Sequence, residues 1–146
     1  MSHTYTNFLY HIVFSTKERL PLIGRELKPR LYDHIGGTVR DLGGIQLEIG
    51  GAADHVHILI KLKPTIQFSD LMRELKANTS KWANEITGGR FEWQDGYGAF
   101  TVGGSQVESV RRYIRDQEAH HLGISFEDEF KDLLRNSGID FDERFL

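Results

Sequence analysis

Cysteine is absent from this sequence, and proline and methionine are scarce, with three and two residues among 146. Without cysteine the chain has no disulfides, no thiolate nucleophile and no thiolate ligands for zinc. Any metal must therefore be held by histidine, carboxylate or amide groups. The sequence also has no apolar run near the length that a membrane span needs, and no secretory signal precedes its first apolar segment. We expect one globular, cytoplasmic domain that does not enter a membrane.

The chain also lacks the basic excess that is typical of nucleic-acid-binding proteins, because its formal net charge is −3. This average hides an asymmetry along the chain. The residues from Glu118 onward include eight acidic and three basic side chains, so this tail carries −5 and the preceding residues carry +2. The lysines and arginines of this mildly basic body occur in small clusters. Each cluster alone is typical of a solvated surface, so a binding role depends on what lies beside it.

The first half of the sequence alternates strand-like and helix-like segments. Aromatic and β-branched residues at positions 5–14 predict a first strand. Apolar residues at helical spacing within positions 24–42 predict a helix. Alternating apolar residues at 45–49 then predict a strand that turns at Gly50-Gly51. The segment after this turn, residues 55–62, is apolar enough to be a central strand of a sheet.

The second half begins with the longest predicted helix, which covers residues 65–87 with Thr65 as its N-cap. Residues 97–102 predict a further strand. Ser105 to Glu108 has the pattern of a capping box and predicts the start of a helix that carries Tyr113. A similar pattern at Ser125 predicts the last helix.

The resulting order βαββαβ, followed by two helices, is that of the α+β ferredoxin-like fold, an antiparallel sheet with two helices on one face. We expect a single domain over residues 1–146, with the ferredoxin-like core at 1–104 and the C-terminal helices at 105–146. In this plan the strand at residues 55–62 lies in the middle of the sheet.

His55 and His57 begin the predicted central strand. Side chains at i and i+2 of a strand project from one face, so the two imidazoles are spaced as metal ligands. A His-x-His pair alone is weak support, because structural or surface histidines give the same pattern. The preceding Asp54 is interpreted as a turn residue, with a hydrogen bond to a ligating histidine as the second option.

Tyr113 and Gln117 lie four residues apart in a predicted helix and therefore share a face. Such a helix can present a nucleophile and a third metal ligand together. The alternative is a tyrosine at the rim of the apolar stripe and an exposed glutamine. With the histidine pair, the constellation suggests metal-assisted phosphoryl transfer through a phosphotyrosine. His120 and His121 follow and are interpreted as capping or surface residues that are able to contact DNA, and no role is assigned to His11.

Four motifs of this sequence together resemble the small single-tyrosine HUH transposases of bacterial insertion sequences, the IS-two-hundred/six-hundred-five family with its REP-associated relatives. The resemblance covers nearly the whole chain. It rests on the order and spacing of Tyr10-His11-Ile12-Val13-Phe14-Ser15-Thr16-Lys17, Asp54-His55-Val56-His57, Gly96-Tyr97-Gly98-Ala99-Phe100, and Tyr113-Ile114-x-x-Gln117-x-x-His120-His121.

The resemblance implies that Tyr113 is the nucleophile and that His55, His57 and Gln117 hold a divalent metal, for which we favour Mg²⁺ or Mn²⁺. It further implies single-stranded DNA with hairpins as substrate, cut and rejoined through a 5′-phosphotyrosine, and a homodimer in which the Tyr113 helix of one chain serves the histidines of its partner. The DNA contacts expected on this basis are Lys17, Lys61, Lys63, Lys76, Lys81, Arg111, Arg112, Arg115, His120 and His121.

Three other functions remain open from the sequence. One is a domesticated endonuclease that processes REP hairpins by the same chemistry. Another is a metal-dependent nuclease in which water attacks in place of Tyr113. The third is a non-catalytic ferredoxin-like module that binds nucleic acid or another ligand, with the histidine pair structural.

Overall fold

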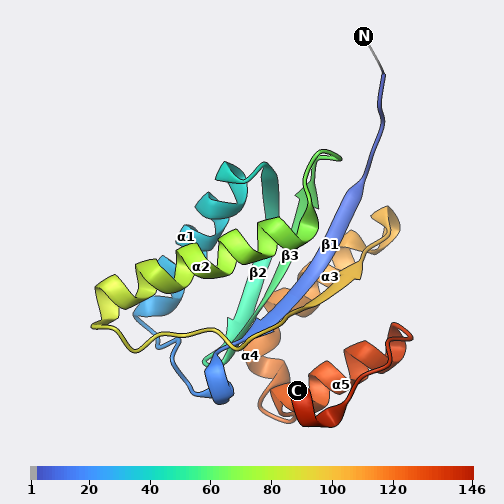
Figure 1. Ribbon diagram of the computed structural model, residues 1–146. Coiled ribbons are helices and arrows are strands. Elements are labelled where there is room, and N and C mark those ends of the chain that lie inside the picture. Colours follow the sequence, from blue (N-terminus) through green and yellow to red (C-terminus); the bar gives the residue numbers. More distant parts are fainter. Residues whose placement is uncertain (1–2) are drawn as a thin grey trace.

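The sheet of this protein has four antiparallel strands in the order β2-β3-β1-β4, as seen in a computed structural model that describes residues 3–146 (Figure 1). The strands are β1 (Phe8–Ser15), β2 (Gly44–Ala52), β3 (His55–Leu62) and β4 (Gly98–Thr101). β3 pairs with neighbours on both sides and therefore lies in the middle of the sheet. The predicted ferredoxin-like fold and the central position of β3 are confirmed.

Helices cover both faces of this sheet (Figure 1). α1 (Leu27–Asp41) and α2 (Phe68–Thr87) pack together on one face, and α3 (Val107–Arg115) and α4 (Gln117–His120) lie on the other. α5 (Phe126–Asn136) follows at the lower edge in the view of Figure 1. Short 3₁₀ turns occur at Lys17–Arg19, Gly104–Gln106 and Glu143–Phe145.

β3 is buried on both faces, which explains its nearly continuous apolar sequence. Val56, Ile58 and Ile60 point to the larger core under α1 and α2. Leu59 points to a smaller core under α3, where Ile114 covers it. Because side chains alternate along a strand, the two histidines share the α3 face with Leu59.

A β-bulge in β2 changes which side chains reach the α3 face. Gln46 pairs with Ile60 and Glu48 with Leu59, so Leu47 is the extra residue. The bulge breaks the alternation expected for residues 45–49. As a result Glu48 and, two residues later, Gly50 turn toward α3.

The predicted turn at Gly50-Gly51 is wrong, because β2 continues through Ala52 and the chain reverses at Ala53-Asp54. Gly50 serves a different purpose: a Cβ at this position would lie 2.0 Å from the carbonyl oxygen of Ile114. Only glycine lets the backbone of α3 approach the sheet this closely.

Several predicted boundaries also differ from the structure. β1 begins at Phe8, and α2 begins at Phe68 after the N-cap Gln67, so Thr65 is not its cap. The expected capping box at Ser105 is replaced by a bond from the Gly103 amide to Gln106 Oε1, 3.0 Å long. The cap at Ser125 is confirmed by its bond from the Asp128 amide.

The expected continuous helix around Tyr113 is divided, because α3 ends at Arg115 and α4 begins at Gln117. Asp116 lies between them with φ −94° and ψ 18°, outside the helical region. Among the helices of residues 3–146, none combines the length and apolar character of a membrane span.

Candidate active site

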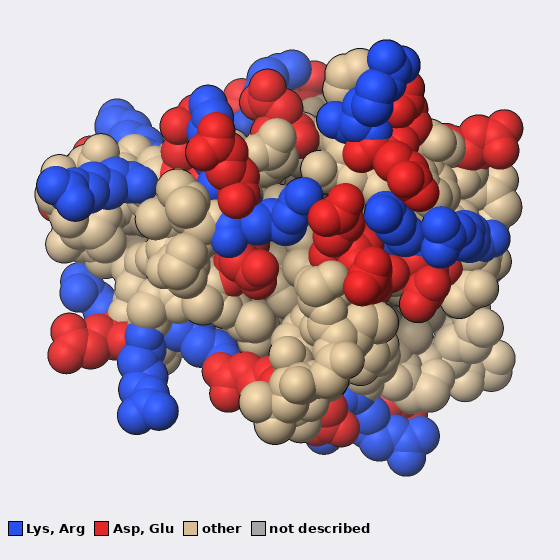
Figure 2. All heavy atoms as spheres, turned by 90° about the horizontal axis from the view of Figure 1, so that it is seen from below, with Lys and Arg blue, Asp and Glu red and all other residues tan. Residues whose placement is uncertain are grey.

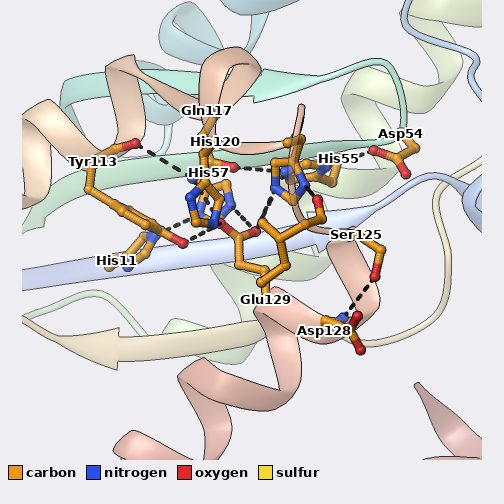
Figure 3. Close-up of polar contacts among 12 residues, drawn as sticks. His11, Asp54, His55, His57, Tyr113, Gln117, His120, Ser125, Asp128 and Glu129 are labelled. Carbon is orange, nitrogen blue, oxygen red and sulfur yellow. Dashed lines mark hydrogen bonds and ion pairs between the residues drawn. The ribbon is translucent and has the colours of Figure 1, made fainter.

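His55 and His57 form the fixed part of the site, and both are fully buried on the face of β3 that α3 covers. Their ring centroids lie 5.1 Å apart. Figure 3 shows both rings pointing toward side chains from α3, α4 and α5. The structure thus places the two predicted ligands on one face of a rigid strand.

Asp54 fixes the orientation of His55. Its Oδ1 lies 2.7 Å from His55 Nδ1. Burial acts to raise the pKa of Asp54, but the hydrogen bond and charge of His55 lower it below its ordinary value. A carboxylate can only accept, so Nδ1 carries a proton and the ring turns Nε2 into the site. Asp54 is therefore both a turn residue and the orienting partner of His55.

His57 is oriented by a residue to which the sequence analysis assigned no role. Its Nδ1 lies 2.7 Å from His11 Nε2, and its Nε2 lies 3.0 Å from Glu129 Oε1. Burial lowers the pKa of His57 to about 4, although Glu129 opposes this shift. Burial, with the nearby His57, also lowers the pKa of His11 to about 3. Both rings are neutral at pH 7, and the neutral ring is the form that binds metals.

Gln117, the predicted third ligand, is fully buried at the start of α4. Its amide nitrogen donates to Glu129 Oε2 over 2.9 Å. The amide oxygen consequently faces His55 Nε2 at 3.0 Å. An amide oxygen can only accept, so this contact is favourable when a proton or a cation lies between the two atoms.

Tyr113 lies beside the histidines of its own chain, with its ring centroid 5.6 Å from that of His57. The resemblance implied a partner's histidines instead. Its hydroxyl donates a hydrogen bond to Glu129 (Figure 3). Burial, followed by the bond to Glu129 and the charge of that group, raises the pKa of Tyr113 above its ordinary value. The phenol is therefore held in its neutral form in this arrangement.

Glu129 was not predicted, although its carboxylate is at the centre of the site and only 2% exposed. It comes from α5 and contacts His57, Tyr113 and Gln117. Burial acts to raise its pKa, but the hydrogen bonds and charge of these partners lower it well below the usual range. Nothing in the sequence distinguishes it, because it lies in an acidic stretch typical of a solvated helix.

His121 also reaches this cluster. Its Nδ1 lies 2.7 Å from the carbonyl oxygen of Ile124, which can only accept, so Nδ1 carries the proton. Its Nε2 faces Glu129 Oε1 at 3.0 Å. His120 lies on the other side of the carboxylate, with Nε2 3.3 Å from Oε2. Both histidines were predicted as DNA contacts, and the structure directs both toward Glu129.

The donor atoms that converge here suit a divalent cation. One atom each from His55, His57, His121 and Glu129 all lie within 4.8 Å of one another, and Gln117 adds an amide oxygen beside His55. Neutral imidazoles, an amide oxygen and one carboxylate are ligands that Mn²⁺ accepts, and the oxygens also suit Mg²⁺. A cation between these atoms would be bound by the imidazoles, the amide oxygen and the carboxylate together.

Some of the lysines and arginines predicted to contact DNA are bonded to other groups of the protein, and the others are exposed to solvent. Arg111 and Arg115 both bind Glu48 on β2, at 3.4 and 3.2 Å, so neither faces the phenol of Tyr113. Lys76 donates to two carbonyl oxygens of the loop before β4, and Lys17 pairs with Glu92. The remaining predicted contacts, Lys61, Lys63, Lys81 and Arg112, are exposed.

The charges on the face seen in Figure 2 are interspersed, with basic side chains lying next to acidic ones. No continuous basic field covers that face. Contact with a polyanion would therefore depend on individual cations and on the site itself.

Comparison with known proteins gives a consistent result. The family described as "Transposase IS200 like" matches residues 4–117. The transposases for insertion sequence element IS200 of Salmonella typhimurium and Salmonella typhi are each 31% identical to the chain over 125 residues. Each of these matches covers 80% of this chain and 81% of the relative.

Two solved structures share the fold. A candidate transposase from Deinococcus radiodurans superposes with a TM-score of 0.65 at 21% identity, covering 80% of this chain and 96% of that one. A REP-associated tyrosine transposase bound to a REP hairpin superposes with a TM-score of 0.61 at 16% identity, covering 100% of this chain and 92% of that one. His121 and Glu129 lie beyond residue 117, outside the stretch that the family matches.

Proposed function

Because this chain belongs to the IS200-like transposases, we propose that it cuts and rejoins single-stranded DNA at the ends of a mobile element, with Tyr113 as the nucleophile. One observation carries the proposal. Tyr113 and Gln117, brought by α3 and α4, meet the histidine pair of β3 in a single buried cluster. A nucleophile beside a potential metal site is the arrangement that phosphoryl transfer requires.

In the proposed reaction the Tyr113 oxygen forms a bond to the scissile phosphorus, and the bond from phosphorus to the 3′ oxygen breaks. The phenol proton is released to water, because the lowered pKa of Glu129 makes its carboxylate a weak proton acceptor, and the departing 3′ oxygen takes up a proton to become a hydroxyl. The DNA then remains attached to Tyr113 through its 5′ phosphate. A 3′-hydroxyl can later attack this bond and release the tyrosine, so one phosphodiester is exchanged for another.

Within this proposal, a divalent ion, Mg²⁺ or Mn²⁺, held by His55, His57 and Gln117 would supply Lewis-acid stabilisation of the charge on the scissile phosphate. The chain itself provides neutral ligands at these three positions. Asp54 and His11 keep the two rings oriented. Asp54 and His11 thereby direct the Nε2 atoms of His55 and His57 toward the proposed metal position before substrate binds.

We further propose hairpin-bearing single-stranded DNA as the substrate. The family relationship and the REP hairpin bound by a protein of the same fold support this substrate class. The exposed Lys61, Lys63, Lys81 and Arg112 are available to the phosphate backbone. Processing of chromosomal hairpins by the same chemistry is a second form of the function, favoured by the full-length match to that REP-associated protein.

The test is a cleavage assay with end-labelled hairpin DNA and Mn²⁺. Wild type should yield a covalent protein–DNA product attached through a 5′ phosphate, and Tyr113→Phe should lower its formation by at least about a thousandfold. Tyr97→Phe is the matched control, because Tyr97 is surface-exposed and has no contact with the histidine pair. It should react like wild type.

Two outcomes would remove the proposed chemistry. Full cleavage by Tyr113→Phe would identify water as the nucleophile. DNA binding without cleavage, unaffected by His55→Ala and His57→Ala, would identify a non-catalytic binding module with a structural histidine pair.

A further inference from the structure

We propose that Glu129 is itself a ligand of the divalent ion, and that the bound ion fastens α5 to the sheet. This inference rests on the metal site of the proposed function and adds to it a residue from outside the family-matched stretch. It makes the docking of the C-terminal helix dependent on metal.

The two carboxylate oxygens of Glu129 face different groups. Oε1 lies 3.0 Å from both His57 Nε2 and His121 Nε2, and 3.7 Å from His55 Nε2. Oε2 instead accepts from the amide of Gln117 and from the hydroxyl of Tyr113. Oε2 also lies 3.3 Å from His120 Nε2. Oε1 therefore faces three imidazoles, while Oε2 holds Tyr113 and faces one imidazole. Through Glu129 the ion and Tyr113 become linked.

The spacing of these donor atoms fits one coordination shell. Neighbouring ligands around an octahedral ion with bonds of about 2.1 Å lie about 3 Å apart. Oε1 meets this spacing toward two imidazole nitrogens, and Gln117 Oε1 meets it toward His55.

The orientation of the rings supports the same assignment. Asp54 Oδ1 and the carbonyl oxygen of Ile124 accept from Nδ1 of His55 and of His121, so both Nε2 atoms face the Glu129 carboxylate. A cation among these atoms would bind the carboxylate and both rings together.

The remaining attachment of α5 is incomplete. Phe126 stacks on the ring of His55, with centroids 4.4 Å apart, and Leu134 is also buried. A pocket of about 230 Å³ nevertheless lies beside α5, lined by aromatic and aliphatic side chains and by the polar Ser15, Arg19, Gln94 and Asp95. Because the contact between α5 and the rest of the protein is not closely packed, a bond from Glu129 to a metal ion would contribute much of the stability of the docked helix.

Calorimetric titration of chelator-treated protein with Mn²⁺ tests the ligand assignment without DNA. Glu129→Gln removes the charge at nearly constant shape and should weaken Mn²⁺ binding at least tenfold. Glu127→Gln is the control, because it makes the same change on the same helix at an exposed carboxylate that pairs with Arg19 and Lys131. Its affinity should equal that of wild type.

Hydrogen exchange on unmodified protein tests the docking without any substitution. Addition of Mn²⁺ should slow exchange of the α5 amides at least tenfold. If exchange slows around the histidines of β3 while α5 is unaffected, the ion does not hold α5 and the inference is overturned. Equal or tighter Mn²⁺ binding by Glu129→Gln overturns it as well.

His55→Ala separates this inference from the proposed function. If wild type binds Mn²⁺, His55→Ala does not, and Glu129→Gln binds like wild type, the metal site stands and only the role of Glu129 fails. If wild type does not bind Mn²⁺, the metal part of the proposed function fails together with it.

Discussion

At the scale of single residues, the site is organised by groups that decide where protons lie. Asp54 holds the proton of His55 on Nδ1, and the carbonyl of Ile124 does the same for His121. His11 shares a hydrogen bond with His57. These orienting partners direct the Nε2 atoms of His55 and His121 inward, toward the place of the proposed metal.

Burial of His11 and His57 makes the stability of the metal-free protein depend on pH. Their pKa values, about 3 and about 4, lie below the 6.5 of a free histidine. The unfolded chain therefore binds more protons between pH 6.5 and 4, and the free energy of unfolding should fall as pH falls through this window. Between pH 7.5 and 5.5 the loss is about 1 kcal/mol for each ring.

Chemical denaturation in the presence of chelator would measure this slope. His11→Asn removes one of the two titrating rings and should reduce the slope by about half. Glu129 does not interfere above pH 5, since a carboxylate with a lowered pKa loses its contribution only below its unfolded value, near 4.5. A slope that is identical in wild type and variant would contradict the assignment of a neutral, buried His11.

Simple periodicity was enough to predict some of these residues and not others. The shared face of His55 and His57 follows from a period of two, and that of Tyr113 and Gln117 from helical spacing. His11 depends on which strand pairs with β3, and Glu129 on how a later helix folds back. Neither relation is local, so neither could be predicted from the pattern around the residue.

At the scale of elements, the position of α3 depends on the shape of β2. The bulge directs Glu48 toward α3, where it binds two arginines. Gly50 then lets the Ile114 backbone approach the sheet. Together these contacts hold Tyr113 over β3, so an irregular edge strand determines where the proposed nucleophile lies.

Gly50→Ala should therefore displace α3. The added Cβ would lie 2.0 Å from the Ile114 carbonyl oxygen. This clash cannot be relieved by rotating a side chain, because it requires the backbone of β2 or of α3 to move. We expect a loss of about 1–3 kcal/mol in the free energy of unfolding, measured by denaturant titration. DNA cleavage should fall further than stability alone explains, because Tyr113 moves with its helix.

Gly37→Ala is the control for this change. Gly37 lies inside α1, and a Cβ there meets nothing closer than 3.7 Å. Alanine should stabilise that helix by roughly 0.5–1 kcal/mol. If Gly50→Ala were as harmless as Gly37→Ala, the close approach of α3 to β2 would not exist in solution.

The order of elements was predictable because each has a strong periodic signal, whereas their ends were not. Thr65 and Ser105 have the chemistry of N-caps, yet α2 and α3 begin later. The helix propensities of the residues around Asp116 also do not predict that the Tyr113 helix is divided there. The division coincides with tertiary contacts that Gln117 makes with His55 and Glu129.

At the scale of the whole molecule, one chain brings together every group of the candidate site. Tyr113 lies against its own His57 and is held there by Glu129. The shared sites implied by the resemblance need α3 to leave this position. A dimer of this chain remains a prediction, and in the arrangement described here each protomer would contain a complete site.

Mixing two inactive variants would distinguish these arrangements. Tyr113→Phe retains the histidine pair, and His55→Ala retains the nucleophile. With sites completed within one chain, the mixture should cleave hairpin DNA no faster than the two variants separately. Recovery of cleavage to roughly a quarter or more of wild-type activity, as statistical pairing of subunits would give, would establish sites shared between chains.

The bulge at Leu47 has a last consequence, which concerns changes in chain length. Gln46 and Glu48 already pair with consecutive residues of β3, so Leu47 has no pairing partner in that strand. Loss of this one residue would leave every other pair of the hairpin in its present frame. An insertion or deletion within β2 between Glu48 and Ala52 has no such freedom, since it shifts the strand by one step and exchanges its two faces. The hairpin can thus vary in length at its far end while the histidine end remains in frame.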